Sequence, residues 1–85
     1  MEKMSKVNDE ALEEVVGGKL MRVANESVNY VNVRSGPGTK FGKEYTLRNG
    51  VYVNTVKKVY NEDDGYYWSQ IDDGCWIATH LLKNA

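Results

Sequence analysis

The chain has 85 residues, 12 of them acidic and 11 basic, which gives a formal net charge of −1 at pH 7. This length suits a single domain, and the near-zero charge argues against a dedicated nucleic-acid binder, which usually carries a clear basic excess. With one cysteine an internal disulfide is impossible, and no apolar run approaches the roughly 20 residues that cross a bilayer.

The composition changes at the Gly17-Gly18 pair. Residues 1–18 carry two lysines against five acidic residues, a charge of −3, whereas residues 19–85 carry nine basic against seven acidic residues, a charge of +2. All nine aromatic residues follow Gly18. We therefore divide the chain into an N-terminal segment, residues 1–18, and a domain, residues 19–85.

Residues 8–16 have the pattern of an amphipathic helix. Asn8 can cap its start, and Leu12, Val15 and Val16 share one face at helical spacing, opposite acidic residues. Because helix nucleation is costly, a helix of about 10 residues orders only against a partner. We therefore expect the N-terminal segment to be helical when docked and disordered otherwise.

The stretch from Val7 to Gly18 resembles the double-glycine leaders of bacteriocins and related exported peptides. In that family a peptidase-containing ABC exporter grips apolar side chains of the leader and cuts after the second glycine. The resemblance implies such an exporter as a partner, with a cut between Gly18 and Lys19. The residues it implicates are Val7, Leu12, Val15, Gly17 and Gly18. The alternative is a helix that packs permanently on the following domain and ends at the glycines.

Residues 19–85 read as short strands separated by turns. Strands rich in valine, tyrosine and threonine are expected at residues 20–24, 31–34, 45–47, 51–60, 66–71 and 75–78. Asn49-Gly50 predicts a hairpin between the third and fourth of these, and Asp72-Asp73-Gly74 predicts one between the last two. Residues 79–82 are expected to form one 3-10 turn. The sequence therefore predicts an all-β fold.

The order of several motifs resembles the bacterial SH3 family. The motifs are Val31-Asn32-Val33-Arg34-Ser35-Gly36-Pro37-Gly38, then Trp68-Ser69-Gln70-Ile71, then Trp76-Ile77-Ala78. The resemblance implies a small SH3-like barrel of five to seven short strands, with a 3-10 turn near the C-terminus. It also implies a non-catalytic module that holds its ligand along its loops.

A barrel this small is filled by side chains. The candidate core residues are Val31, Val33, Leu47, Val53, Ile71, Ile77 and Leu82. Trp68 and Trp76 fit two interpretations, since each could belong to the core or stack on a ligand.

Tyrosines that flank loops are the preferred ligand-binding candidates, because each offers a flat apolar face and a hydroxyl group. The predicted ligand-binding residues are Tyr30, Tyr45, Tyr66, Tyr67, Trp68 and Asp72. Tyr66 and Tyr67 could instead shield the edge of the barrel. The acids of the two loops, Asp63, Asp64, Asp72 and Asp73, could meet an ammonium group of a peptide or be simply solvated, and Arg34 could likewise face water.

No catalytic, metal or cofactor site is predicted. Cys75 and His80 stand five positions apart, and strand alternation turns Cys75 outward if Trp76 points inward, so a Cys–His dyad is disfavoured. Scattered acids do not supply the three or four ligands of a metal site, and the glycines at 36 and 38 lack the context of a phosphate loop. Cys75 could link two chains through a disulfide or be a partly buried small residue.

The two resemblances together imply a secreted, extracellular binding module associated with the cell wall. Its expected ligand is bacterial peptidoglycan or its peptides, with no nucleic acid, membrane span or cofactor involved. Two alternatives remain, an exported bacteriocin-like or signalling peptide and a protein–protein interaction module. The bacteriocin-like leader suggests the first, while the modest charge of the domain argues against membrane disruption.

Overall fold

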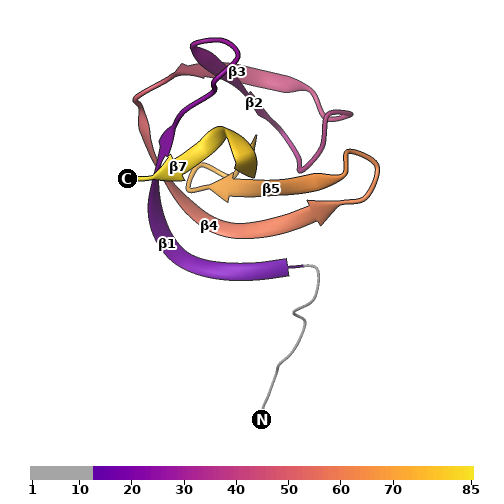
Figure 1. Ribbon diagram of the computed structural model, residues 1–85. Helices are drawn as coiled ribbons and strands as arrows, with labels where there is room; N and C mark the ends of the chain where they lie inside the picture. Colours follow the sequence, from indigo (N-terminus) through magenta and orange to yellow (C-terminus); the bar gives the residue numbers. More distant parts are fainter. Residues whose placement is uncertain (1–12) are drawn as a thin grey trace.

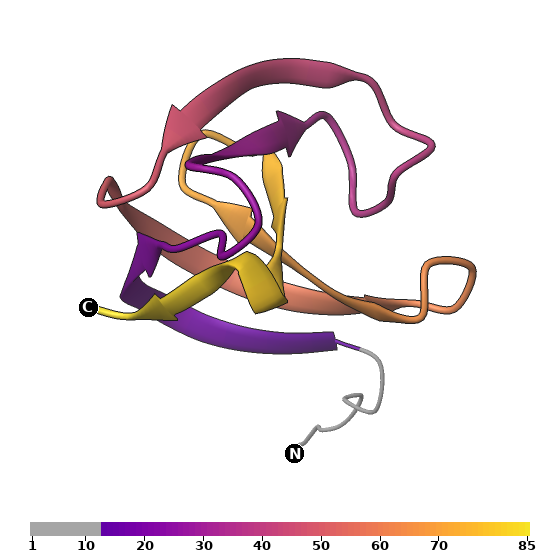
Figure 2. The ribbon, with the colours of Figure 1, turned by 45° about the horizontal axis from the view of Figure 1, so that its top comes forward.

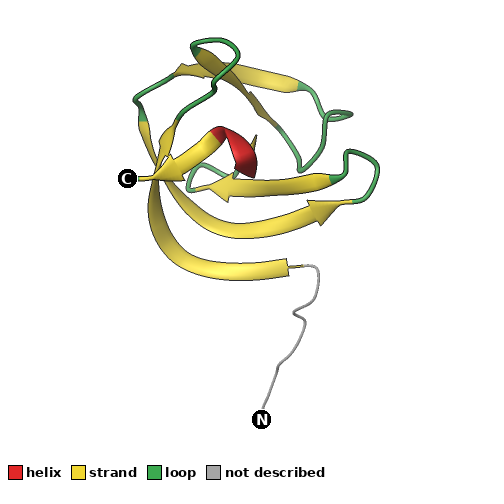
Figure 3. Ribbon diagram, viewed as in Figure 1, coloured by secondary structure: helices red, strands yellow, loops and turns green. Residues whose placement is uncertain are grey.

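A computed structural model describes residues 13–85, and over this range the fold is all-β, as predicted (Figures 1 and 3). Val7 and most of the predicted helix lie outside the described residues. Nothing in residues 13–85 is a helix with the length and hydropathy of a membrane span. The elements are β1 (Glu13–Val23), β2 (Tyr30–Arg34), β3 (Lys43–Arg48), β4 (Tyr52–Asn61), β5 (Tyr66–Ile71), β6 (Trp76–Ala78), the 3-10 helix η2 (Thr79–Leu81) and β7 (Leu82–Asn84).

The seven strands form one antiparallel sheet in the order β3-β2-β6-β5-β4-β1-β7. The long strands β1 and β4 bend strongly, so the sheet curls around its own interior (Figure 1). β1 pairs with β4 on one side and with β7 on the other, where Met21 lies opposite Asn84. The first and last described strands are therefore neighbours.

The interior is filled by two packed groups of apolar side chains. The larger group contains six of the seven predicted core residues, and the seventh, Leu47, packs against it half-buried. The smaller group is built on Trp68, Trp76 and Ala78. Each buried aliphatic or aromatic side chain contributes about 1.5–3 kcal/mol relative to exposure, so both tryptophans are mainly structural. The larger group consists of Val23, Val31, Val33, Val53, Ile71, Ile77 and Leu82.

The predicted hairpin at Asn49-Gly50 is wrong, although the turn itself is present. Gly50 has φ +96°, and the Val51 amide donates to the Arg48 carbonyl across the turn. However, β3 pairs with β2, whereas β4 pairs with β1 and β5, so the two strands leave the turn in different directions. The reason lies outside the turn, because the Asn49 amide group hydrogen-bonds to the Asn25 backbone and holds the turn against the loop after β1. The second predicted hairpin, between β5 and β6, is confirmed.

The structure also differs from the predicted helix at residues 13–16, which form the first part of β1. Val15 pairs with Lys57 of β4, and the register then shifts before Lys19 pairs with Thr55. The three residues between these pairs face a single residue of β4, and they include Gly18 with φ +82°. Such a bulge needs a residue that tolerates positive φ. A short helix without a partner is costly to nucleate, and pairing with β4 satisfies the same backbone groups.

Substituting Gly50 with alanine is expected to destabilise the fold by about 1–2 kcal/mol, because an L-residue is strained at positive φ. A matched control is Gly42→Ala, since Gly42 has no positive φ and no atom lies within 4 Å of the added Cβ. Urea unfolding followed by tryptophan fluorescence measures both changes. Equal stabilities of the two variants would contradict the strained turn.

Candidate functional site

A cleft of about 200 Å³ opens between β2, β5 and η2. Tyr30, Asn32 and Arg34 line one side of it, because the intervening residues Val31 and Val33 point into the core. The alternation of β2 thus produces a packed inner face and a polar, aromatic face toward the cleft.

The remaining walls come from β5 and the chain around η2. Tyr66 and Trp68 contribute from β5, and His80 and Leu81 contribute from η2. The rings of Tyr66 and Trp68 lie 5.7 Å apart, and the His80 ring meets Tyr66 edge-on at 4.6 Å. Burial and the charge of Asp64 raise the pKa of the Tyr66 hydroxyl, so this group stays a neutral hydrogen-bonding partner at physiological pH.

The cleft brings together three of the six predicted ligand-binding residues. Tyr30, 42% exposed, lies at the rim, Tyr66 is half-buried and Trp68 is buried. Tyr67 does not line the cleft, because its neighbours Tyr66 and Trp68 do and successive strand residues point to opposite faces.

Tyr45 and Asp72 also lie away from the cleft. The Tyr45 hydroxyl donates a hydrogen bond to the carboxylate of Asp73, next to Asp72 in the β5–β6 turn. Burial, followed by this hydrogen bond, raises the pKa of Tyr45, while the same bond lowers the pKa of Asp73. The interaction joins β3 to the turn, so Tyr45 has a structural partner.

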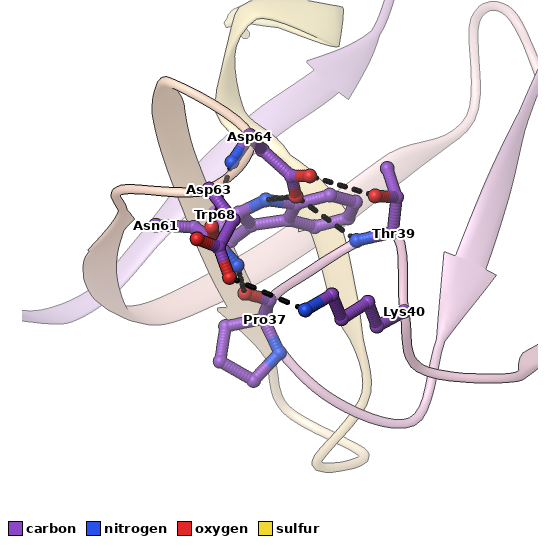
Figure 4. A network of polar contacts seen from close by, with 7 residues as sticks. All are labelled: Pro37, Thr39, Lys40, Asn61, Asp63, Asp64 and Trp68. Carbon is purple, nitrogen blue, oxygen red and sulfur yellow. Dashed lines mark hydrogen bonds and ion pairs between the residues drawn. The ribbon is translucent and has the colours of Figure 1, made fainter.

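The loop between β2 and β3, residues 35–42, projects from the same end of the barrel as the loop between β4 and β5 (Figure 2). Asp64 links the two loops: its carboxylate accepts hydrogen bonds from the Thr39 backbone amide at 2.9 Å and the Thr39 hydroxyl at 2.7 Å (Figure 4). The Trp68 indole nitrogen donates to the same carboxylate at 3.0 Å. These bonds lower the pKa of Asp64, the Thr39 hydroxyl being the largest cause.

Asn61 strengthens the same connection from the end of β4. Its side-chain amide donates to the Pro37 carbonyl at 2.8 Å, and its side-chain oxygen accepts from the Asp64 amide at 2.8 Å (Figure 4). The nearby pair of Lys40 and Asp63, 3.5 Å apart, is highly exposed and adds little. Of the two acids in this loop, Asp63 is thus solvated and Asp64 holds the structure together.

The motif from Asn32 to Gly38 is explained by this loop. Arg34 does not simply face water; one guanidinium nitrogen donates to the Thr39 carbonyl at 3.2 Å and to the Phe41 carbonyl at 2.9 Å. A Cβ atom on Gly36 would come within 2.4 Å of the Phe41 ring, and one on Gly38 within 2.5 Å of the Asn61 side chain. The glycines are therefore needed for close packing rather than for phosphate binding.

Cys75 and His80 lie in different surroundings. Cys75 is half-buried against the larger core group, whereas His80 is exposed and lines the cleft. Burial, with the charge of Asp73, raises the pKa of the Cys75 thiol, which disfavours the reactive thiolate. The partly buried interpretation of Cys75 therefore holds, and a disulfide-linked dimer stays a prediction.

Sequence reasoning singled out the aromatic residues of the cleft but missed the residues that shape it. The sequence leaves Arg34 and Asp64 open to interpretation as solvated residues and indicates no role for Thr39 or Asn61. The available signal was composition: a polar residue beside a glycine-rich loop often bonds to the loop backbone. Asp64 and Thr39 stand 25 residues apart, so their contact has no local sequence pattern.

The curled antiparallel sheet and its cleft lined by aromatic side chains place this protein among small β-barrel binding modules. The bacterial SH3 domain family matches residues 29–83, and the chain belongs to this family. Bacterial SH3 domains are generally non-catalytic binding modules that often bind cell-wall components and are often extracellular. Searches of curated proteins and of solved structures found no match.

Protonation of Asp64 is expected to loosen the loop at low pH. Because its folded pKa is depressed, the stabilisation is present above the unfolded value of about 3.9 and is lost as the pH falls through the lower folded pKa. In Asp64→Asn, the loss of unfolding free energy below about pH 4 is therefore expected to be shallower than in the parent. Asp63→Asn is the matched control, and urea unfolding between pH 6 and pH 2 is the measurement. Identical pH profiles for the parent and Asp64→Asn would contradict this role.

Proposed function

We propose that this protein is a secreted module that binds bacterial peptidoglycan through its stem or bridge peptides. The observation that carries the proposal is the cleft, where two tyrosines and a tryptophan meet polar groups of β2. Ligand sites typically combine aromatic walls with a few convergent polar groups in this way. The family is the second support, since its members often bind cell-wall components.

The chemistry of the cleft suits a short peptide better than a highly charged ligand. Tyr30 offers an accessible ring, and the Asn32 amide can both donate to and accept from a peptide group. The guanidinium of Arg34 is already committed in part to the loop carbonyls, which leaves it as a positioning residue. A peptide that lies across these groups would exchange its hydrogen bonds with water for bonds to the cleft while covering the aromatic surface.

The cleft is also well prepared for binding. Asp64, Asn61 and Arg34 fix the loop of residues 35–42 from three directions. A wall that is already ordered loses little conformational entropy when a ligand arrives. Binding affinity would then depend on the contacts themselves rather than on the cost of closing a loop.

We further propose that residues 1–18 are a leader, removed between Gly18 and Lys19 by a peptidase-containing ABC exporter. The support is the spacing of Val7, Leu12 and Val15 before the glycine pair and the acidic character of the segment. The Gly18–Lys19 bond lies inside β1, between two stretches that pair with β4. A peptidase needs an extended chain in its own cleft, so β1 must be unpaired when the cut is made.

Replacing Tyr30 with alanine is expected to weaken binding to purified sacculi about five- to thirty-fold, which corresponds to a loss of about 1–2 kcal/mol of aromatic contact. Tyr52→Ala is the matched control, because Tyr52 is 59% exposed and does not line the cleft. Sedimentation of the protein with sacculi over a range of concentrations measures both. If neither the parent nor the control is retained, or if Tyr30→Ala is retained equally well, peptidoglycan is not the ligand of this cleft.

Incubation of the full chain with the peptidase domain of a double-glycine exporter is expected to release residues 19–85, a product of 67 residues. Cleavage should be slow for the folded protein and faster in moderate urea that leaves the peptidase active, because β1 must first separate from β4. Intact mass spectrometry identifies the cut, and Gly18→Val is expected to block it. A cut elsewhere, or none in urea, would contradict the leader assignment.

A further inference from the structure

A second hollow, of about 350 Å³, lies beside the cleft, where β4 ends and β5 begins. In the ladder between these strands Tyr60 lies opposite Tyr67, and both residues belong to the sheet face away from Trp68 and the core. Tyr66 and His80 line the hollow as well as the cleft. One pair of rings thus forms the wall between two concave surfaces.

The aromatic rings of the hollow are held in place before any ligand binds. The Tyr60 and Tyr67 rings meet at an angle of 68° with their centroids 5.0 Å apart. The Lys58 ammonium group lies 5.1 Å from the centroid of the Tyr67 ring, a cation–π distance. Tyr67 nevertheless remains 42% exposed, so this ring is both positioned and accessible.

The lining of the hollow indicates the class of its ligand. Apart from Gly65 and Thr79, it consists of the three tyrosines and His80, which combine apolar ring faces with hydroxyl and imidazole groups. A pyranose ring has the complementary character, with C–H groups on its faces and hydroxyl groups around its edge. A nucleobase is also flat, but a chain with net charge −1 lacks the basic excess that accompanies nucleic-acid binding.

We propose that this hollow binds a sugar ring of the glycan strand whose peptide occupies the cleft. The inference deepens the proposed function and rests on it, because peptidoglycan carries both parts in one molecule, with the peptide attached to the sugar. Tyr66 and His80 lie where the two parts would meet. The module then recognises the junction of glycan and peptide rather than either part alone.

The test uses the full chain with two separate probes, chitotetraose for the hollow and a synthetic stem tetrapeptide for the cleft. His80 is the single histidine of the chain, so its ring protons give one resolved set of NMR signals at the shared wall. We expect each probe to shift these signals in a saturable way. The amide signals of Tyr67 and Tyr30 report separately on the hollow and on the cleft.

Three variants assign the response to a surface. Tyr67→Ala is expected to weaken chitotetraose binding at least tenfold and leave tetrapeptide binding unchanged, whereas Tyr67→Phe, which keeps the ring, retains most of the sugar binding. Tyr30→Ala is expected to show the opposite selectivity. Tyr67 and Tyr30 are equally exposed, at 42%, so these two substitutions serve as matched controls for each other.

The outcomes separate the inference from the proposed function. No chitotetraose binding, or binding that is insensitive to Tyr67→Ala, overturns the inference even if the tetrapeptide binds. Tetrapeptide binding that fails while the sugar still binds at Tyr67 overturns the peptide assignment of the cleft and leaves the sugar site in place. Binding of both probes, each sensitive to its own variant, supports the shared recognition site.

Discussion

The Asp64 carboxylate accepts hydrogen bonds from Thr39, 25 residues earlier in the chain, and from the indole nitrogen of Trp68. It thereby ties the loop of residues 35–42 to the strand that forms the floor of the cleft. Trp68 is 2% exposed, and a buried donor without a partner costs about 1–3 kcal/mol. The Asp64 carboxylate thus gives the buried indole N–H of Trp68 a hydrogen-bond partner. It also holds the loop of residues 35–42 beside the cleft.

Strand β5 connects the two candidate surfaces through its alternation. Trp68 lines the cleft, Tyr67 lines the hollow, and Tyr66 at the start of the strand lines both. The two surfaces therefore share the backbone of β5 as part of their support. Tyr66 and His80, which contact each other edge-on at 4.6 Å, are common to both. A ligand on either surface would therefore contact rings that also line the other surface.

Much of the fold was predictable because it depends on local alternation. The strand that contains Val31 and Val33 and the hairpin at residues 72–74 follow from patterns of period two and from turn residues. The absence of a hairpin at Asn49-Gly50 was not predictable in the same way, since Asn49 bonds to Asn25 and β4 pairs with β1 and β5 instead of β3. The spacing of apolar residues at 12–16 is helical, but a short helix needs a partner, and β4 instead pairs with residues 13–15 as a strand.

The candidate site shows the same limit. Tyr30 and Tyr66 could be chosen from the sequence because exposed aromatic residues near loops often bind ligands. Tyr67 lies outside the cleft, and strand alternation predicts this only once the direction of a neighbouring side chain such as Trp68 is known. Asp64 accepts a hydrogen bond from the Thr39 backbone amide, and Arg34 donates to the Phe41 carbonyl. Contacts of this kind with a loop produce no periodic pattern in the sequence.

The pairing of β1 with both β4 and β7 also sets an order of events in time. The segment that contains Gly17 and Gly18 is synthesised early, but its partners are Tyr52–Asn61 and Leu82–Asn84. During translation β1 therefore cannot pair until β4 and then β7 have been synthesised. Such non-local pairing is slow to form. Lys19 pairs with Thr55, so the Gly18–Lys19 bond becomes part of the sheet only after β4 has been synthesised. The proposed cut at Gly18–Lys19 would thus need no unpairing of β1 in a chain that has not yet completed β4.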